Sequence, residues 1–88
     1  VIVLKGQNTA MSRTTLSSAK SGDRCVVLKI ASDPPEMKSR LYALGIIPGS
    51  AIELLRFAPL GDPMQVKVGG SFVSIRKSEA KIITVDIQ

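Results

Sequence analysis

Histidine is absent from this chain of 88 residues, and its single cysteine is Cys25. Without histidine, no Ser-His-Asp or Cys-His catalytic arrangement can be assembled. A tight iron or zinc site needs several imidazole, thiolate or clustered carboxylate ligands, so we expect no metal site and at most weak binding of transition metals. A lone cysteine forms no intramolecular disulfide, which small secreted domains often need. We therefore expect a soluble protein in the cytoplasm.

Long apolar runs are missing as well. The segment Val1–Leu4 is too short for a signal-peptide core, and no run approaches the roughly 18 apolar residues of a membrane-spanning helix. We expect no direct membrane insertion. Residues 7–21 are rich in serine and threonine and can bury little apolar surface. We expect residues 1–13 to be a flexible N-terminal tail, of which 1–10 are a leader or an added segment, and residues 14–88 to form one domain.

Aromatic residues and glycine-rich phosphate loops are scarce or absent. Aromatics make up 3% of the chain, too few for a surface on which nucleic-acid bases stack. Neither the P-loop pattern nor the three-glycine dinucleotide pattern occurs. The net charge is +5, but within residues 14–88 basic and acidic side chains are interspersed, as on an ordinary solvated surface. We expect no cofactor and no nucleic-acid partner.

The carboxylates have plainer roles than catalysis. We expect Asp33 and Glu36 to cap a helix, Asp62 to form a turn, and Glu79 to lie in the first turn of a short helix. Cys25 lies in an apolar segment with no cluster of cations, which is typical of a small buried hydrophobe. The sequence therefore predicts no catalytic residue and a protein that is not an enzyme.

The residues that are present show the periodicity of strands, interrupted by one helix. Val26, Leu28 and Ile30 alternate with other residues and predict a first strand with one strongly apolar face. A helix follows the segment 32–36, with an apolar stripe at Met37, Leu41 and Leu44. Gly45 is placed for a left-handed C-terminal cap, and Pro48-Gly49 for a turn.

Four more strands are expected after that turn. They cover residues 50–57, 64–68, 71–76 and 83–87, with Gly69-Gly70 as a hairpin turn and a single helical turn at residues 78–80. Five short strands and one short helix after the first strand indicate a mainly β fold. We predict a small closed five-stranded barrel, because closure removes exposed strand edges.

The residues of the turns resemble those of one protein family. The segment Arg40-Leu41-Tyr42-Ala43-Leu44-Gly45-Ile46-Ile47-Pro48-Gly49 is similar to the helix and turn of the FeoA family of ferrous iron transport proteins. Weaker matches lie at residues 16–23, 58–63 and 75–85, so the resemblance covers about residues 14–87. It implies an SH3-like barrel that serves as an accessory of FeoB, a membrane GTPase that transports ferrous iron. It also implies recruitment to the inner face of the cell membrane.

Two function classes remain open. The first is an adaptor that contacts the transporter. The second is a regulator module, because the same barrel also resembles the carboxy-terminal domain of iron-dependent transcriptional repressors. On that interpretation the chain would be a fragment of a longer protein. We expect a monomer or a weak homodimer that pairs through an exposed strand edge.

Candidate partner contacts are apolar residues in turns and one helical arginine. Leu60, Asp62 and Met64 belong to or adjoin a turn that has little reason to be apolar if it only faces water. Ile46 and Ile47 lie in the other loop. Arg40 could present its charge to the transporter or bond to a carboxylate of its own chain, and Arg76 has the same two alternatives.

Overall fold

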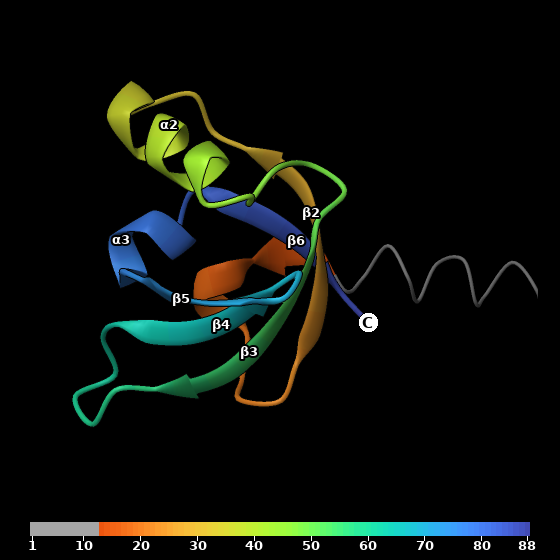
Figure 1. The fold of residues 1–88 in the computed structure, drawn as a ribbon, viewed down its shortest axis with the longest axis vertical. Helices are drawn as coiled ribbons and strands as arrows, with labels where there is room; N and C mark the ends of the chain where they lie inside the picture. The colour runs from red at the N-terminus through yellow and green to blue at the C-terminus, as the bar shows by residue number, and fades with distance from the viewer. Residues whose placement is uncertain (1–12) are drawn as a thin grey trace, which may run out of the picture.

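The computed structural model describes residues 13–88, which form one curled antiparallel sheet with helices at one end (Figure 1). The strand order in these residues is β1-β6-β2-β3-β4-β5. The elements in chain order are β1 (Arg13–Thr15), the 3-10 helix η1 (Leu16–Ser18), β2 (Arg24–Ile30), α2 (Pro35–Ala43), β3 (Ala51–Phe57), β4 (Met64–Val68), β5 (Ser71–Ile75), α3 (Lys77–Ala80) and β6 (Ile83–Ile87). The mainly β, SH3-like character and the short helix are as predicted.

The prediction of five strands in a closed barrel was wrong in two respects. The described residues form six strands, because Arg13–Thr15 pairs with β6 as an additional short strand. The sheet is not closed, since β1 and β5 are both edges. Helix η1 follows β1 and α3 follows β5, and these two segments contact each other through buried residues that include Leu16 and Ala80. Side-chain packing therefore joins the two ends of the sheet in place of a strand pair.

The expected tail falls mostly outside the described residues. Its residues 1–12 lie there, whereas Arg13 is the first residue of β1 and pairs with Asp86.

The core is aliphatic, as the scarcity of aromatics predicts. Its largest fully buried side chains are Leu16, Leu41, Ile46, Ile52, Leu54, Met64, Ile75, Ile83, Val27, Val66, Val85 and Cys25. Phe57 is half-buried against this cluster, while Tyr42 and Phe72 are exposed. Burial of aliphatic surface at about 25 cal/mol per Å² is the main favourable term for a domain of this size.

The first long strand departs from simple alternation. A β-bulge lies between Val27 and Lys29, and an extra residue in one strand shifts every later side chain to the opposite face. Cys25 and Val27 are buried before the bulge and Ile30 after it. The predicted apolar face of Val26, Leu28 and Ile30 is therefore correct only for Ile30.

Helix α2 is capped as expected at its C-terminus but not at its N-terminus. Gly45 has φ 87°, its N–H donates to Tyr42 O at 3.0 Å, and Ile46 N–H donates to Leu41 O at 2.9 Å. This pair of bonds is a Schellman motif. At the N-terminus, Pro34 occupies the cap position and no side chain caps the helix, so the predicted caps by Asp33 and Glu36 do not form.

Candidate functional site

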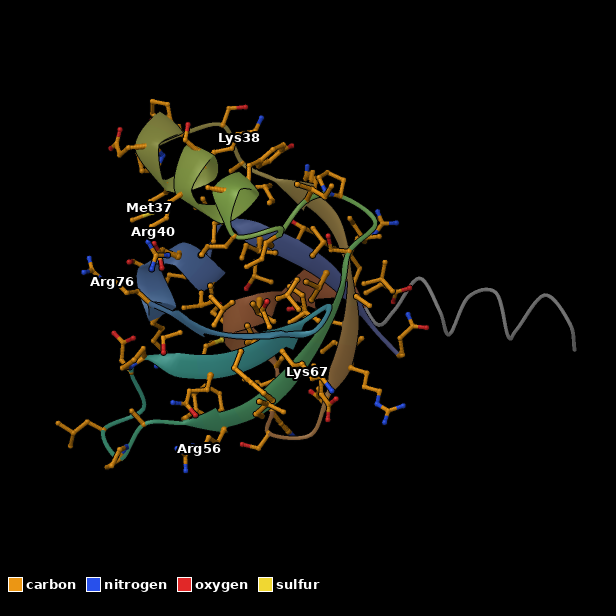
Figure 2. The ribbon with its side chains drawn as sticks, in the orientation of Figure 1. Met37, Lys38, Arg40, Arg56, Lys67 and Arg76 are labelled. Carbon is orange, nitrogen blue, oxygen red and sulfur yellow. The ribbon has the colours of Figure 1, made fainter. Side chains whose placement is uncertain are left out.

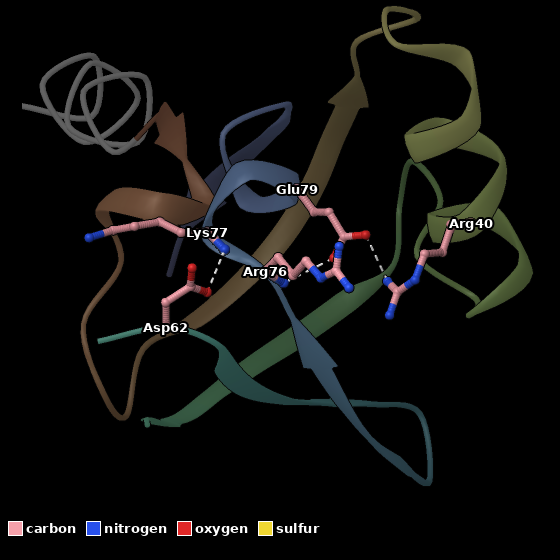
Figure 3. A network of polar contacts seen from close by, with 5 residues as sticks. All are labelled: Arg40, Asp62, Arg76, Lys77 and Glu79. Carbon is pink, nitrogen blue, oxygen red and sulfur yellow. Dashed lines mark hydrogen bonds and ion pairs between the residues drawn. The ribbon is translucent and has the colours of Figure 1, made fainter. Parts of the chain in front are cut away.

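The loop between β3 and β4 presents an apolar residue to solvent. Its turn is closed by a bond from Gly61 N–H to Ala58 O at 2.7 Å, and its base by one from Ala58 N–H to Pro63 O at 2.8 Å. Leu60 lies in this turn and is 97% exposed. At the base of the loop, Lys77 N–H donates to Asp62 Oδ1 at 2.9 Å (Figure 3). This bond fixes the loop to the first turn of α3 and leaves Leu60 free.

Two of the candidate contact residues belong to the core. Met64 is 1% exposed and Ile46 is fully buried. Met64 is the first residue of β4 and pairs with Ile75 of β5, so its side chain faces the inside of the sheet. Ile46 follows the Schellman turn, where an apolar side chain commonly packs back on the helix. Neither side chain is accessible to a partner, and the expectation that they form a contact surface is corrected.

The remaining apolar candidates lie at opposite ends of one strand. Ile47 precedes β3 and is 42% exposed, and Leu60 follows β3. Strand β3 has seven residues, which at about 3.3 Å per residue separates its ends by roughly 20 Å. The structure thus does not bring Ile47 and Leu60 together into one surface.

Arg40 has an intramolecular partner that the sequence does not reveal. Its Nη1 lies 2.9 Å from Glu79 Oε2 (Figure 3), and the two side chains are 48% and 4% exposed. The other oxygen of Glu79, Oε1, accepts the N–H of Arg76 at 2.9 Å. Only one half of a capping box is formed at α3, because an arginine side chain has no acceptor for the reciprocal bond. Of the two alternatives for Arg40, the structure shows the second, in which its guanidinium bonds to a carboxylate of its own chain.

Two exposed aromatic residues were not among the sequence candidates. Phe72 of β5 is 73% exposed, and Lys67 Nζ lies 6.0 Å from the centre of its ring. Tyr42 of α2 is 42% exposed, with Lys38 Nζ at 5.6 Å from its ring. The sequence of β5 could have predicted the exposure of Phe72. Side chains alternate between the two faces of a strand, so if Val73 and Ile75 face inward, Phe72 faces outward.

The chemistry of the described residues is sparse. Burial, with lesser effects of the Asp23 and Asp86 charges, raises the pKa of the Cys25 thiol from 9.0 to about 11. The thiol is therefore protonated near neutral pH and is a poor nucleophile. Within residues 13–88, no group of three cysteine, aspartate or glutamate side chains is placed to hold a metal ion. No helix in that part of the chain is long and apolar enough to cross a membrane.

Comparison with known proteins agrees with this fold. The FeoA domain matches residues 14–87. The chain belongs to the FeoA family. FeoA from Chlorobium tepidum is 43% identical with a TM-score of 0.75, and the match covers 84% of this chain and 70% of that one. FeoA from Stenotrophomonas maltophilia, an SH3 domain protein solved with zinc, is 30% identical with a TM-score of 0.72 over 83% and 89% of the two chains.

A curated FeoA relative is part of a longer protein. It is the Fe(2+) transport protein A/Fe(2+) transporter FeoB fusion protein of Porphyromonas gingivalis, 28% identical over 72 residues. The match covers 82% of this chain and 8% of the fusion protein. A manganese-dependent transcriptional repressor has the same fold, with a TM-score of 0.79 at 21% identity over 86% of this chain and 42% of that one. At that identity the likeness concerns the fold alone.

Proposed function

We propose that this FeoA-family chain is a non-enzymatic accessory of bacterial ferrous iron uptake that acts by contact with FeoB, the membrane GTPase transporter. The observation that carries the proposal is the fusion relative, in which FeoA and FeoB occupy one polypeptide. Joining two domains in one chain raises their effective concentration to about the millimolar range, which favours pairs that contact each other. The chain would act on the cytoplasmic side, at the inner face of the membrane.

The proposed contact is the β3–β4 loop with Leu60 at its tip and Asp62 at its base. A leucine that is 97% exposed on a turn fixed by Asp62 is a preordered apolar anchor. Binding energy is usually concentrated in such few anchors that enter a pocket of the partner. Ile47 and Arg40 are not part of this proposed contact, since β3 separates Ile47 from the loop and Glu79 engages Arg40.

A pull-down at physiological salt with the cytoplasmic part of FeoB from the same source tests this contact. Leu60→Asp should weaken binding by at least about tenfold, because a carboxylate would replace the leucine that is buried in the complex. Ile47→Asp makes the same kind of change at the opposite end of β3, and Ser18→Asp adds a charge at the exposed last residue of η1; both should bind normally. Loss of binding with Ile47→Asp alone would move the contact to the end of β3 at which Ile47 lies.

The alternative function is that of a regulator domain, for which the repressor fold likeness is the supporting observation. Failure of the wild-type chain to bind FeoB, together with salt-sensitive binding to DNA, would favour this alternative. Binding to FeoB without any shift of DNA would exclude it.

A further inference from the structure

The outer edge of β5 has no partner strand within residues 13–88. Val68 and Ser71 flank the two-residue turn Gly69-Gly70 and are paired with each other. In such a hairpin the closing pair is hydrogen-bonded and the pairs then alternate. The N–H and C=O groups of Phe72 and Ser74 therefore point away from β4. They form a row of donors and acceptors to which another strand can be added.

This edge lacks the usual protection against pairing. Natural edge strands carry charged residues, proline or bulges that discourage an added strand. Strand β5 has the sequence Ser-Phe-Val-Ser-Ile, and its register with β4 runs without a bulge. Phe72 stands 73% exposed on its outer face. An unprotected edge with an exposed aromatic residue is suited to strand addition.

The surroundings of the edge define which side chains an added strand would carry. Helix α2 lies on the side of the molecule toward which this edge is open (Figures 1 and 3). A surface pocket between the end of α2, the start of β3 and the β4–β5 turn adjoins the Ser71 end of β5; it is lined by Leu44, Gly45, Ser50, Ala51, Val68 and Gly69. Leu44 and Val73 are only partly buried. Side chains of an added strand that point to this side would therefore meet apolar surface at Leu44 and Val73.

Cations outnumber carboxylates around the edge. Arg76 directly follows β5, and Figure 2 shows it close to Arg40 of α2. The carboxylate between them is Glu79, whose two oxygens are already engaged by Arg40 Nη1 and Arg76 N–H. Lys67 lies beside Phe72 on the neighbouring strand, with Glu53 opposite it on β3. These cations attract an acidic occupant and repel a second copy of this basic chain.

We propose that the β5 edge binds an extended acidic segment of a partner protein by strand addition, with alternate apolar side chains against α2 and carboxylates near Arg76. The inference uses no residue of the Leu60 loop, so it does not depend on the proposed contact with FeoB. Backbone bonds would supply general affinity, and the apolar and charged positions would supply specificity.

Fluorescence anisotropy with the full chain tests the proposal, using a labelled peptide of alternating valine and glutamate, about eight residues long. A peptide in which lysine replaces glutamate is the charge control. The acidic peptide should bind, the basic one should not, and bound peptide should slow amide exchange at Phe72 and Ser74. Failure of the acidic peptide to bind, or equal binding of both peptides, would overturn the proposal.

Two variants separate strand addition from simple charge attraction. Ser74→Pro removes an outward N–H without touching the β4 ladder, since proline is tolerated at such edge positions; it should abolish binding, while Ser74→Ala should not. Arg76→Glu should weaken binding about tenfold and Lys20→Glu, the same change in a distant loop, less than about threefold. Circular dichroism confirms that each variant is folded. If Ser74→Pro bound the acidic peptide as tightly as wild type does, strand addition would be refuted. If the wild-type chain formed a dimer that Ser74→Pro dissociates, the edge would bind a second copy and not an acidic partner segment.

Discussion

Glu79 is a single residue that joins distant parts of this fold. Its carboxylate is 4% exposed and joins α2 to α3 through Arg40, 39 residues earlier in the chain. A buried carboxylate is stable only when it is paired and hydrogen-bonded. The local sequence predicts Glu79 as an acid in the first turn of a helix, which is correct. It does not predict the burial or the partner, because both depend on how distant elements pack.

Replacement of Glu79 by glutamine should destabilise the protein by about 1 to 3 kcal/mol. The amide keeps one acceptor for Arg76 N–H, but its NH₂ group would then face the donor Nη1 of Arg40. Urea unfolding followed by circular dichroism measures the change. Glu53→Gln on the outer face of β3 is the matched control and should lie within about 0.5 kcal/mol of wild type. Equal effects of both variants would show that the Arg40–Glu79 pair adds nothing.

The thiol of Cys25 should make stability fall at alkaline pH. Its pKa in the folded protein is raised from 9.0 to about 11 by burial and by the nearby Asp23 and Asp86 charges. Between these two values the unfolded state loses a proton that the folded state keeps, so the free energy of unfolding falls as pH rises. The stabilisation is complete below pH 9.0 and is lost through about pH 11.

A Cys25→Ala variant isolates this effect from the titration of lysine and tyrosine. Urea unfolding of both proteins at pH 8, 10 and 11 should show that wild type loses more stability than the variant. The excess should be about 2 kcal/mol, since the shift of two pKa units corresponds to at most about 2.7 kcal/mol. Parallel pH profiles for the two proteins would refute the shifted pKa.

Elements were predictable where local chemistry decides them. Gly45, Pro48-Gly49 and Gly69-Gly70 placed the turns correctly, because positive φ or a preset φ is required there. The apolar face of β2 was predicted wrongly from its alternation, since the bulge between Val27 and Lys29 cannot be recognised in a single sequence. Strand β1 was missed for a related reason: its three residues, Arg-Thr-Thr, form a strand only because β6 lies beside them.

The turn after α2 can be tested with one methyl group. Gly45→Ala places a Cβ in open space but at φ 87°, a conformation that costs an L-residue about 1 kcal/mol. Gly70→Ala is the matched control, because its Cβ also meets nothing within 4 Å and its φ is not positive. Thermal unfolding should show a lower Tm for Gly45→Ala and almost no change for Gly70→Ala. Equal Tm values would mean that the Schellman turn does not hold the helix end.

At the scale of the whole molecule, the sequence predicted the class of fold but not its surface. A hairpin-rich aliphatic pattern with family-like turns indicates an SH3-like domain, and the structure and the comparisons confirm it. Whether a loop residue is accessible depends on which face of the folded sheet its side chain points to. Leu60 and Met64 differ by four positions in the chain, yet one is 97% exposed and the other 1%. The same curled sheet that buries Met64 leaves β1 and β5 as edges.

Open edges raise the question of association, and we expect the chain to be a monomer at micromolar concentration. Strand β5 offers five residues, whereas stable protein interfaces involve about 20 to 30 residues on each side. The net charge of +5 adds repulsion between copies. Sedimentation equilibrium should show a monomer at low salt and at most a weak dimer near millimolar concentration when about 1 M salt screens that repulsion. An obligate large oligomer at low salt would contradict this, since charge repulsion and a short edge both oppose it.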